Sequence, residues 1–127
     1  MHRQIIAISA VVLALGLAGC GRKHPPMPTH GFVNPGVTLK LDPAEAPDCK
    51  PTSTYVATVS WSVNSLNTPK TEVLINGPEG QSFARSNDRT AKKDTGKWVA
   101  PGLWFVLLDR RSGEMLGAVQ AGPKPCP

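Results

Sequence analysis

Along residues 55–63 the chain places an apolar side chain at every second position. These positions carry Tyr55, Ala57, Val59, Trp61 and Val63. Except for Val56, the positions between them hold Ser or Thr. A period of two over this length predicts a β-strand with one face in a core and the other in water.

Other short segments are rich in strand-forming residues and are separated by turn signals. We expect strands at residues 37–41, 71–76, 81–85, 103–108 and 115–121. The segment 103–108 is continuously apolar, as in a central strand that is covered on both faces. Residues 76–80, Asn-Gly-Pro-Glu-Gly, are a cluster of turn formers. No segment has a sustained helical period, so the sequence predicts an all-β domain.

Several short strands with turns between them favour a sandwich. The pattern, with Trp61 late in the second strand and a hairpin at the end, resembles immunoglobulin-like and fibronectin type III-like domains. The resemblance covers residues 37–126 and implies a small sandwich of about seven antiparallel strands. It concerns architecture only, because Cys49 and Cys126 lie outside the facing strands that a true immunoglobulin cystine joins. Small barrels and transthyretin-like sandwiches are the alternatives.

The first twenty residues have a different character. A basic start, Met1-His2-Arg3-Gln4, precedes an apolar run at residues 5–17 and then Ala18-Gly19-Cys20. These are the parts of a secretory signal, and the apolar run is shorter than the roughly 20 residues of a spanning helix. Leu17-Ala18-Gly19-Cys20 resembles the lipobox of bacterial lipoproteins. The resemblance implies a signal peptide at residues 1–19 and a lipid (palmitate) on Cys20; a plain secretory signal is the alternative.

Lipidation implies stable attachment to a membrane, since each buried CH₂ contributes roughly 0.8 kcal/mol. Gly21 follows the cysteine where a retention signal would have Asp, and in the enterobacterial sorting rule this implies the outer membrane, facing the periplasm. Residues 21–36 hold four prolines and three glycines, a composition that predicts an extended, disordered tether. We therefore expect a tether at residues 20–36 and a β-sandwich domain at residues 37–127.

The charge of the domain is smaller than the formal net charge of +5 indicates. Arg3, Arg22 and Lys23 are three of the fourteen basic residues and precede the domain, which leaves eleven against nine acidic residues, a net of +2. A nucleic-acid-binding domain would carry a clustered basic footprint, so we expect no nucleic-acid partner. Arg22 and Lys23 are expected beside anionic head groups.

Two cysteines remain after lipidation of Cys20. In an oxidising envelope an even pair predicts a disulfide, here between Cys49 and Cys126. Two free thiols, a metal pair or a redox pair are the alternatives. No histidine lies near either cysteine, and their spacing is not Cys-x-x-Cys.

Residues 37–127 contain no histidine, which removes the commonest general base and metal ligand. The acidic residues form no recognisable motif, and Asn87, Asp88 and Asp94 are too few for a calcium site. We predict a protein that is not an enzyme and has no cofactor or metal. An enzyme that uses acids alone, with two carboxylates in one cleft, is the alternative.

Two features are candidates for binding. The segment 85–97 is basic, and Arg89, Lys92 and Lys93 could contact anionic lipid, lipopolysaccharide phosphates or an acidic partner. The alternative, which we favour, is a solvated edge strand whose lysines discourage pairing with other sheets.

The second feature is aromatic. Trp98 could stack on a sugar or anchor a protein interface, although we favour a core position at the end of the sandwich. Trp104 shares the face of its strand that points away from the core with Val106 and Leu108. So apolar a face needs a cover, either the tether or a partner.

These features predict a membrane-anchored envelope lipoprotein that acts as a protein-binding module, as an adaptor, an accessory subunit or an inhibitor. Its partner is expected to be another envelope protein, since a sheet edge can accept an added strand. The alternative is a structural or glycan-binding protein that contacts peptidoglycan or lipopolysaccharide through Trp98 and the basic segment.

Overall fold

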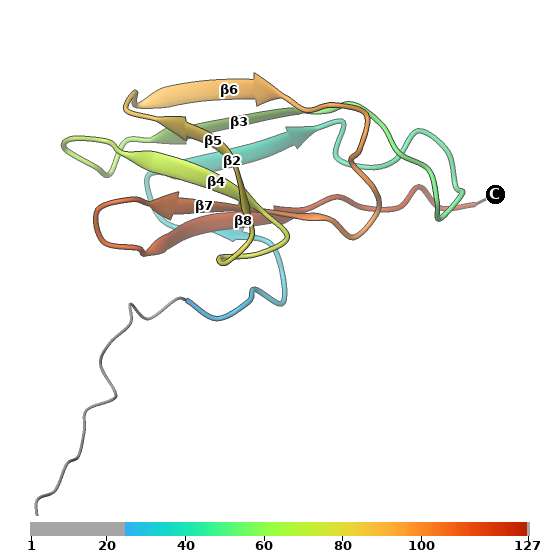
Figure 1. Ribbon diagram of the computed structural model, residues 1–127, viewed down its shortest axis with the longest axis horizontal. Helices are drawn as coiled ribbons and strands as arrows, with labels where there is room; N and C mark the ends of the chain where they lie inside the picture. The colour runs from blue at the N-terminus through green and yellow to red at the C-terminus, as the bar shows by residue number, and fades with distance from the viewer. Residues whose placement is uncertain (1–24, 127) are drawn as a thin grey trace, which may run out of the picture.

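The computed structural model describes residues 25–126, which contain eight β-strands and no helix (Figure 1). The strands are β1 (Phe32–Val33), β2 (Val37–Asp42), β3 (Thr58–Val63), β4 (Thr71–Ile75), β5 (Gln81–Ser86), β6 (Thr90–Asp94), β7 (Trp104–Asp109) and β8 (Met115–Gln120). The expected signal peptide and the expected lipid site, Cys20, lie outside the described residues.

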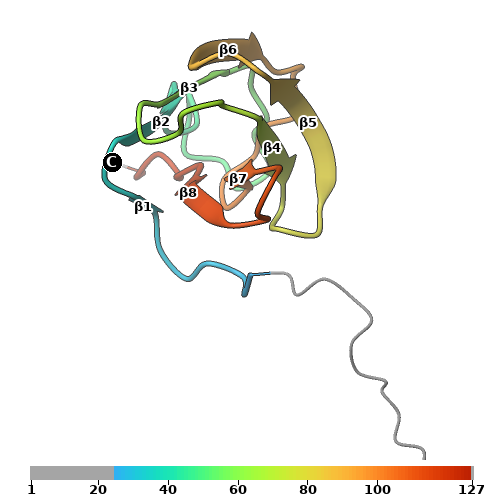
Figure 2. The same ribbon diagram turned by 90° about the vertical axis from the view of Figure 1, so that its left-hand side faces the viewer.

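The strands form two antiparallel sheets that face each other. One sheet has the order β1-β8-β7-β4-β5, and the other has the order β2-β3-β6. Figure 2 shows the two layers curving around a common interior, with β5 and β6 close together on one side. The prediction of a small all-β sandwich is confirmed; the strand beyond the seven expected is β1, which has only two residues.

The core is built by alternate residues of both sheets. In β3, Val59, Trp61 and Val63 are at most 2% exposed, whereas the residues between them are half-buried. From the other sheet, Phe105 and Leu107 are fully buried in the same cluster. Full burial of each such side chain stabilises the fold by about 1.5–3 kcal/mol, so the period-two pattern identified the core residues correctly.

The second predicted strand begins later than expected. Its sheet pairing starts at Thr58, and Tyr55 instead exchanges backbone hydrogen bonds of 2.9 and 3.1 Å with Val99. The side chain of Thr95 causes the interruption, because its Oγ1 accepts the amide hydrogen of Ala57 at 2.9 Å. Tyr55 and Ala57 nevertheless keep the predicted alternation and are both buried.

The expected tether, residues 20–36, contains a strand near its end. Phe32 pairs with Ala118 and Val33 with Gly117, which adds β1 to the edge of the larger sheet. Gly117 permits this approach, since a Cβ there would lie 3.1 Å from the carbonyl oxygen of Phe32. The ordered domain therefore includes β1.

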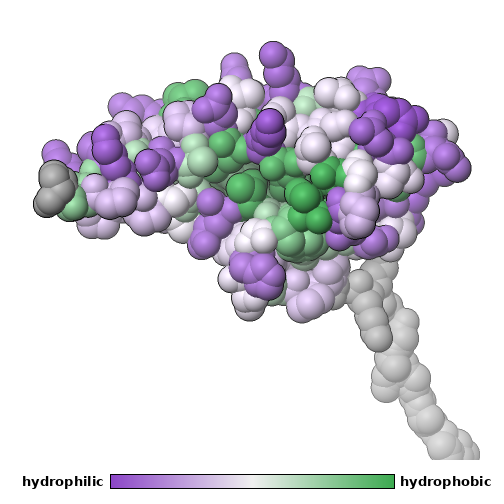
Figure 3. Space-filling model, turned by 180° about the vertical axis from the view of Figure 1, so that it is seen from behind, coloured by the Kyte–Doolittle hydropathy of each residue, from purple (hydrophilic) through white to green (hydrophobic). Residues whose placement is uncertain are grey.

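The sandwich also has an apolar surface. Figure 3, a view from behind Figure 1, shows an apolar patch within a mostly polar surface on the side where β1, β2 and β8 meet. Val33 on this side is 47% exposed. A Cβ placed on Gly117 would lie 3.2 Å from Cγ1 of Val33 and 3.6 Å from Cδ2 of Leu39. The two side chains thus meet over the glycine.

Candidate functional site

Cys49 and Cys126 form a disulfide, as the count of cysteines predicted. Their Cα atoms are 5.0 Å apart although 77 residues separate them in sequence. Just before Cys126, Gly122 exchanges hydrogen bonds with the backbone of Ala44 and Ala46, at 2.9 and 3.0 Å. The disulfide therefore fastens the segment after β8 to the loop between β2 and β3.

The basic segment is divided among different structural roles. It includes β6, which is an edge strand of the smaller sheet, as the edge-strand interpretation predicts. Arg89 donates from Nη1 to the carbonyl oxygens of Val63 and Leu66, at 3.2 and 2.8 Å, and so holds the turn after β3. Lys92 is exposed and points away from the core. Of the three candidate cations in the segment, Lys92 alone is left without a partner within residues 25–126.

Lys93 joins the edges of the two sheets. Its Nζ donates to the carbonyl oxygen of Phe83 at 2.8 Å and lies 5.0 Å from the centre of the Phe83 ring. Phe83 belongs to β5, the edge of the larger sheet. Because a strand added at this edge would need that carbonyl group, Lys93 discourages strand addition here.

Trp98 is attached to the core on one side and open to solvent on the other. The centre of its indole lies 5.7 Å from that of Phe83, edge to face, and 6.1 Å from that of the fully buried Phe105. Yet 38% of Trp98 is exposed. A Cβ at Gly96 would come within 2.8 Å of the indole, so only glycine leaves room for this packing. Trp98 thus contacts the core, as expected, but it is not buried in it.

Trp104 is buried and is not an exposed binding residue. The sequence left open whether the tether or a partner covers its face of the strand. Trp104 is 8% exposed and packs with Val106 and Ala118 on the outer face of the larger sheet. Phe32 and Met115 complete this second apolar cluster. The outer face therefore has a cover, and the cover comes from the chain itself.

Part of the cover is Phe32, at the end of the proline-rich segment 25–32. Pro25 lines a groove together with Leu74 and Leu108 of the outer face. Sδ of Met27 lies 2.6 Å from the position that a Cβ of Gly77 would take, in the turn after β4. The segment then enters β1. A composition that predicted a free tether thus forms a strap across the larger sheet.

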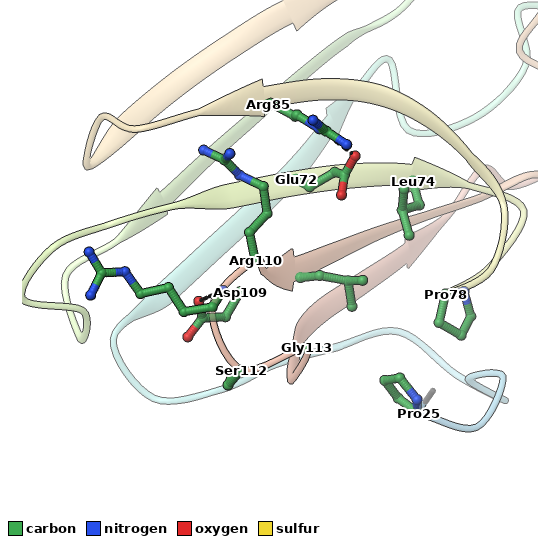
Figure 4. Close-up of a pocket in the computed structure, with 11 residues that line it drawn as sticks. Pro25, Glu72, Leu74, Pro78, Arg85, Asp109, Arg110, Ser112 and Gly113 are labelled. Atoms are coloured by element: carbon green, nitrogen blue, oxygen red, sulfur yellow. Dashed lines mark hydrogen bonds and ion pairs between the residues drawn. The ribbon is translucent and has the colours of Figure 1, made fainter. Parts of the chain in front are cut away.

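A groove of about 680 Å³ lies between this strap and the turns beside it. It is lined by Pro25, Glu72, Leu74, Pro78, Arg85, Leu108, Asp109, Arg110, Arg111, Ser112 and Gly113. Figure 4 shows Arg85 and Glu72 side by side on neighbouring strands, with Arg110 on the same side of the sheet. Sequence reasoning missed this groove, because its residues come from segments far apart in the chain.

Two of the three arginines in the groove are held by the fold. Nε of Arg85 donates to Oε2 of Glu72 at 2.8 Å. Arg110 donates from Nε to the carbonyl oxygen of Thr71 at 3.0 Å, and from Nη2 to Ser86 and Asn87. Among the described residues the guanidinium of Arg111 has no such partner, so it is available to an anion that enters the groove.

Glu72 is ionised more readily than an ordinary glutamate. Burial opposes its ionisation, but hydrogen bonds from Ser82 and Arg85 and the positive charges of Arg85 and Arg110 outweigh burial and lower its pKa. The other carboxylate of the groove, Asp109, accepts the backbone N–H of Arg111 at 2.9 Å. A general acid needs a raised pKa, so Glu72 is suited to binding arginine and not to donating a proton.

Residues 25–126 contain no helix that is long and apolar enough to cross a membrane. In the same part of the chain, no three His, Cys, Asp or Glu side chains gather closely enough to hold a metal ion. No protein-family model matches the chain, and no similar protein was found among curated sequences or solved structures.

Proposed function

We propose that the chain is a lipid-anchored, non-enzymatic envelope lipoprotein that binds another envelope protein, as an adaptor, an accessory subunit or an inhibitor. The lipobox-like residues 17–20 support the anchor on Cys20, and Gly21 supports the outer membrane, facing the periplasm. The anchor and the signal peptide lie outside the described residues, so this part of the proposal depends on the sequence pattern.

The observation that carries the binding function is the position of Trp98. Tryptophan is enriched among the residues that dominate protein–protein affinity. Trp98 is 38% exposed, yet Phe83 and Phe105 hold its ring in place. A side chain that is already immobilised loses little conformational entropy when a partner binds.

The surroundings of Trp98 have the composition of an interface. Lys93 and Lys97 are both exposed. Nζ of Lys93 lies 5.0 Å from the centre of the Phe83 ring, against which Trp98 packs, and Lys97 directly precedes Trp98 in sequence. Protein interfaces commonly place an aromatic anchor within a polar rim. We infer that a partner covers Trp98 and meets the two ammonium groups with acidic or carbonyl oxygens.

The order of the strands supports an immunoglobulin-like assignment, which we also propose. Counted from β2, the first, second and fifth strands form one sheet, and the third, sixth and seventh are neighbours in the other. Immunoglobulin-like sandwiches divide these six strands in the same way, whereas the fourth strand, β5, lies here in the larger sheet and not beside the fifth. Many cell-surface domains with this architecture share no sequence similarity.

Affinity capture tests the binding function. The mature protein is immobilised in detergent, exposed to solubilised envelope of the source bacterium, and the retained proteins are identified by mass spectrometry. We expect one dominant protein that free domain displaces and that Trp98→Ala loses. Val33→Ala is the matched control, because Val33 is 47% exposed and lies in β1, at the edge of the larger sheet opposite β5. If both variants retain the partner protein equally, Trp98 is not part of the interface.

A second function, binding of lipopolysaccharide or an anionic glycan, is supported by the groove around Arg85, Arg110 and Arg111. Guanidinium groups form strong hydrogen bonds with phosphate and carboxylate oxygens. Under this hypothesis Arg111→Glu weakens binding to purified lipopolysaccharide at least tenfold, and Trp98→Ala leaves it unchanged. The opposite pattern would favour the protein-binding function.

A further inference from the structure

The outer face of the smaller sheet carries polar residues arranged in rows. The register of β2, β3 and β6 aligns three residues in each row. The rows are Thr38, Ser62 and Thr90; Lys40, Ser60 and Lys92; and Asp42, Thr58 and Asp94. Every residue of the outer strands β2 and β6 in these rows is exposed.

Charges of the same sign lie in the same row. Lys40 and Lys92 flank Ser60, and two residues further along the strands Asp42 and Asp94 flank Thr58. Asp94 accepts a hydrogen bond of 2.6 Å from Oγ1 of Thr58. Among residues 25–126 the side chains of Lys40, Asp42 and Lys92 have no hydrogen bond or ion pair. The face therefore presents a positive row and, next to it, a negative row to its surroundings.

The dimensions of this charge pattern follow from strand geometry. Two residues along a strand span about 6.7 Å, and two strand spacings span about 9.5 Å. The four charges thus mark the corners of a rectangle. The strand that runs through its middle carries only the short side chains of Thr58, Ser60 and Ser62 on this face, so no bulky group prevents close approach of another sheet face.

We propose that this face binds the same face of a second copy of the chain. A two-fold axis that lies between the lysine row and the aspartate row, perpendicular to the strands, places each lysine of one copy opposite an aspartate of the other. Lys40 then meets Asp42 of the second copy, and Lys92 meets Asp94. Such an interface is isologous, and each contact occurs twice.

The charges also select this arrangement over the other face-to-face dimer. An axis along β3 would place Lys40 opposite Lys92, and Asp42 opposite Asp94, which is repulsive. The favoured axis keeps the strands of the two copies aligned, as in sheets that pack face to face about 10 Å apart. The charge pattern therefore determines both the partner and its orientation.

The interface is small. Three strands of this length cover roughly 20 by 10 Å, well below the approximately 800 Å² that each partner buries in a stable complex. We therefore expect weak, reversible association that depends on charge. It would be favoured where copies are concentrated, and it does not depend on the identity of the envelope partner or on the anchor.

Sedimentation equilibrium tests the proposal with the mature chain carrying Cys20→Ser, because removal of the lipid excludes shared micelles as a cause of association. We expect a monomer–dimer equilibrium at low salt that weakens about tenfold or more near 1 M salt, where the Debye length falls to about 3 Å. If the chain with Cys20→Ser and an otherwise wild-type sequence stays monomeric at millimolar concentration and low salt, the proposal is contradicted.

Charge reversal supplies the decisive comparison. The acidic variant Lys40→Glu/Lys92→Glu and the basic variant Asp42→Lys/Asp94→Lys should each be monomeric, and an equal mixture of the two should associate. Combining all four changes exchanges the rows and should restore self-association. A mixture that stays monomeric would overturn the proposed contact.

Two controls keep the test decisive. Lys50→Glu/Lys70→Glu makes the same change of charge at exposed lysines outside the face and should still associate like the wild type; if it does not, net charge and not this face governs association. Circular dichroism checks that each variant is folded. If the basic variant does not fold, the acidic variant alone decides, and unchanged association of that variant would refute the proposal.

Discussion

The indole nitrogen of Trp61 donates a hydrogen bond of 3.0 Å to Oγ1 of Thr71 across the interior of the sandwich. The two residues are 2% and 0% exposed, respectively. Trp61 belongs to β3 in the smaller sheet and Thr71 to β4 in the larger one. Oγ1 of Thr71 also donates to the carbonyl oxygen of Ser86 at 3.3 Å. This polar link fixes how the two sheets lie against each other.

Loss of the hydroxyl should therefore destabilise the fold. Thr71→Val keeps the volume of the side chain but leaves the buried indole N–H without an acceptor, at a cost of about 1–3 kcal/mol. Urea unfolding measures this cost. Thr68→Val, at an exposed threonine, is the control and should change stability by less than about 0.5 kcal/mol. Equal effects of the two substitutions would show that the buried bond contributes nothing.

Removal of the disulfide should have a larger effect. Cys49 and Cys126 close a loop of 77 residues, for which the chain-entropy relation gives about 4.5 kcal/mol. Cys49→Ala/Cys126→Ala should lower the free energy of unfolding by about this amount. In the wild-type protein, alkylation without reductant should modify neither cysteine. Rapid alkylation of both would contradict the bond.

Trp98 should matter less for stability than a buried aromatic residue. Its ring is 38% exposed, whereas its neighbour Phe105 is fully buried. We expect Phe105→Ala to cost about 3–5 kcal/mol, and Trp98→Ala to cost roughly half as much or less, because part of its surface is already in water. Thermal or urea unfolding of both variants compares them. Equal costs would make Trp98 a core residue and weaken its assignment to an interface.

The lowered pKa of Glu72 predicts how the free energy of unfolding changes at acidic pH. Its pKa in the folded state is lowered from the ordinary value of 4.5, so the folded state binds a proton less readily than the unfolded chain. The resulting stabilisation is fully present above about pH 4.5 and is lost as the pH falls through the folded pKa. The difference in stability between wild type and Glu72→Gln should therefore shrink on acidification from pH 6 to pH 3. A constant difference would contradict the prediction.

Much of the fold was predictable because strands reveal their buried face by alternation. The pattern at residues 55–63 and the continuous apolar run at residues 103–108 identified two central strands and their core residues. Both predictions depend only on the local order of side chains. The register between strands, and therefore the rows on the smaller sheet, could not be predicted from any single segment.

The strap and the aromatic surface were harder to predict for the same physical reason. A proline-rich segment cannot form a sheet interior, but it can lie on an apolar face. Nothing in the local sequence of residues 25–32 shows that Phe32 packs against Trp104 and Val106. Likewise, Lys93 looked like a free cation in sequence. Its contact with Phe83 exists only because two sheet edges meet in space.

Palmitate labelling tests directly whether Cys20 carries a lipid anchor. The full precursor and its Cys20→Ser variant are expressed in a bacterial host, labelled with radioactive palmitate, and separated into membrane and soluble fractions. The account predicts a labelled wild-type protein in the membrane fraction and an unlabelled, soluble variant. Wild-type protein that carries no label, or a variant that keeps it, would contradict a lipid-anchored binding module.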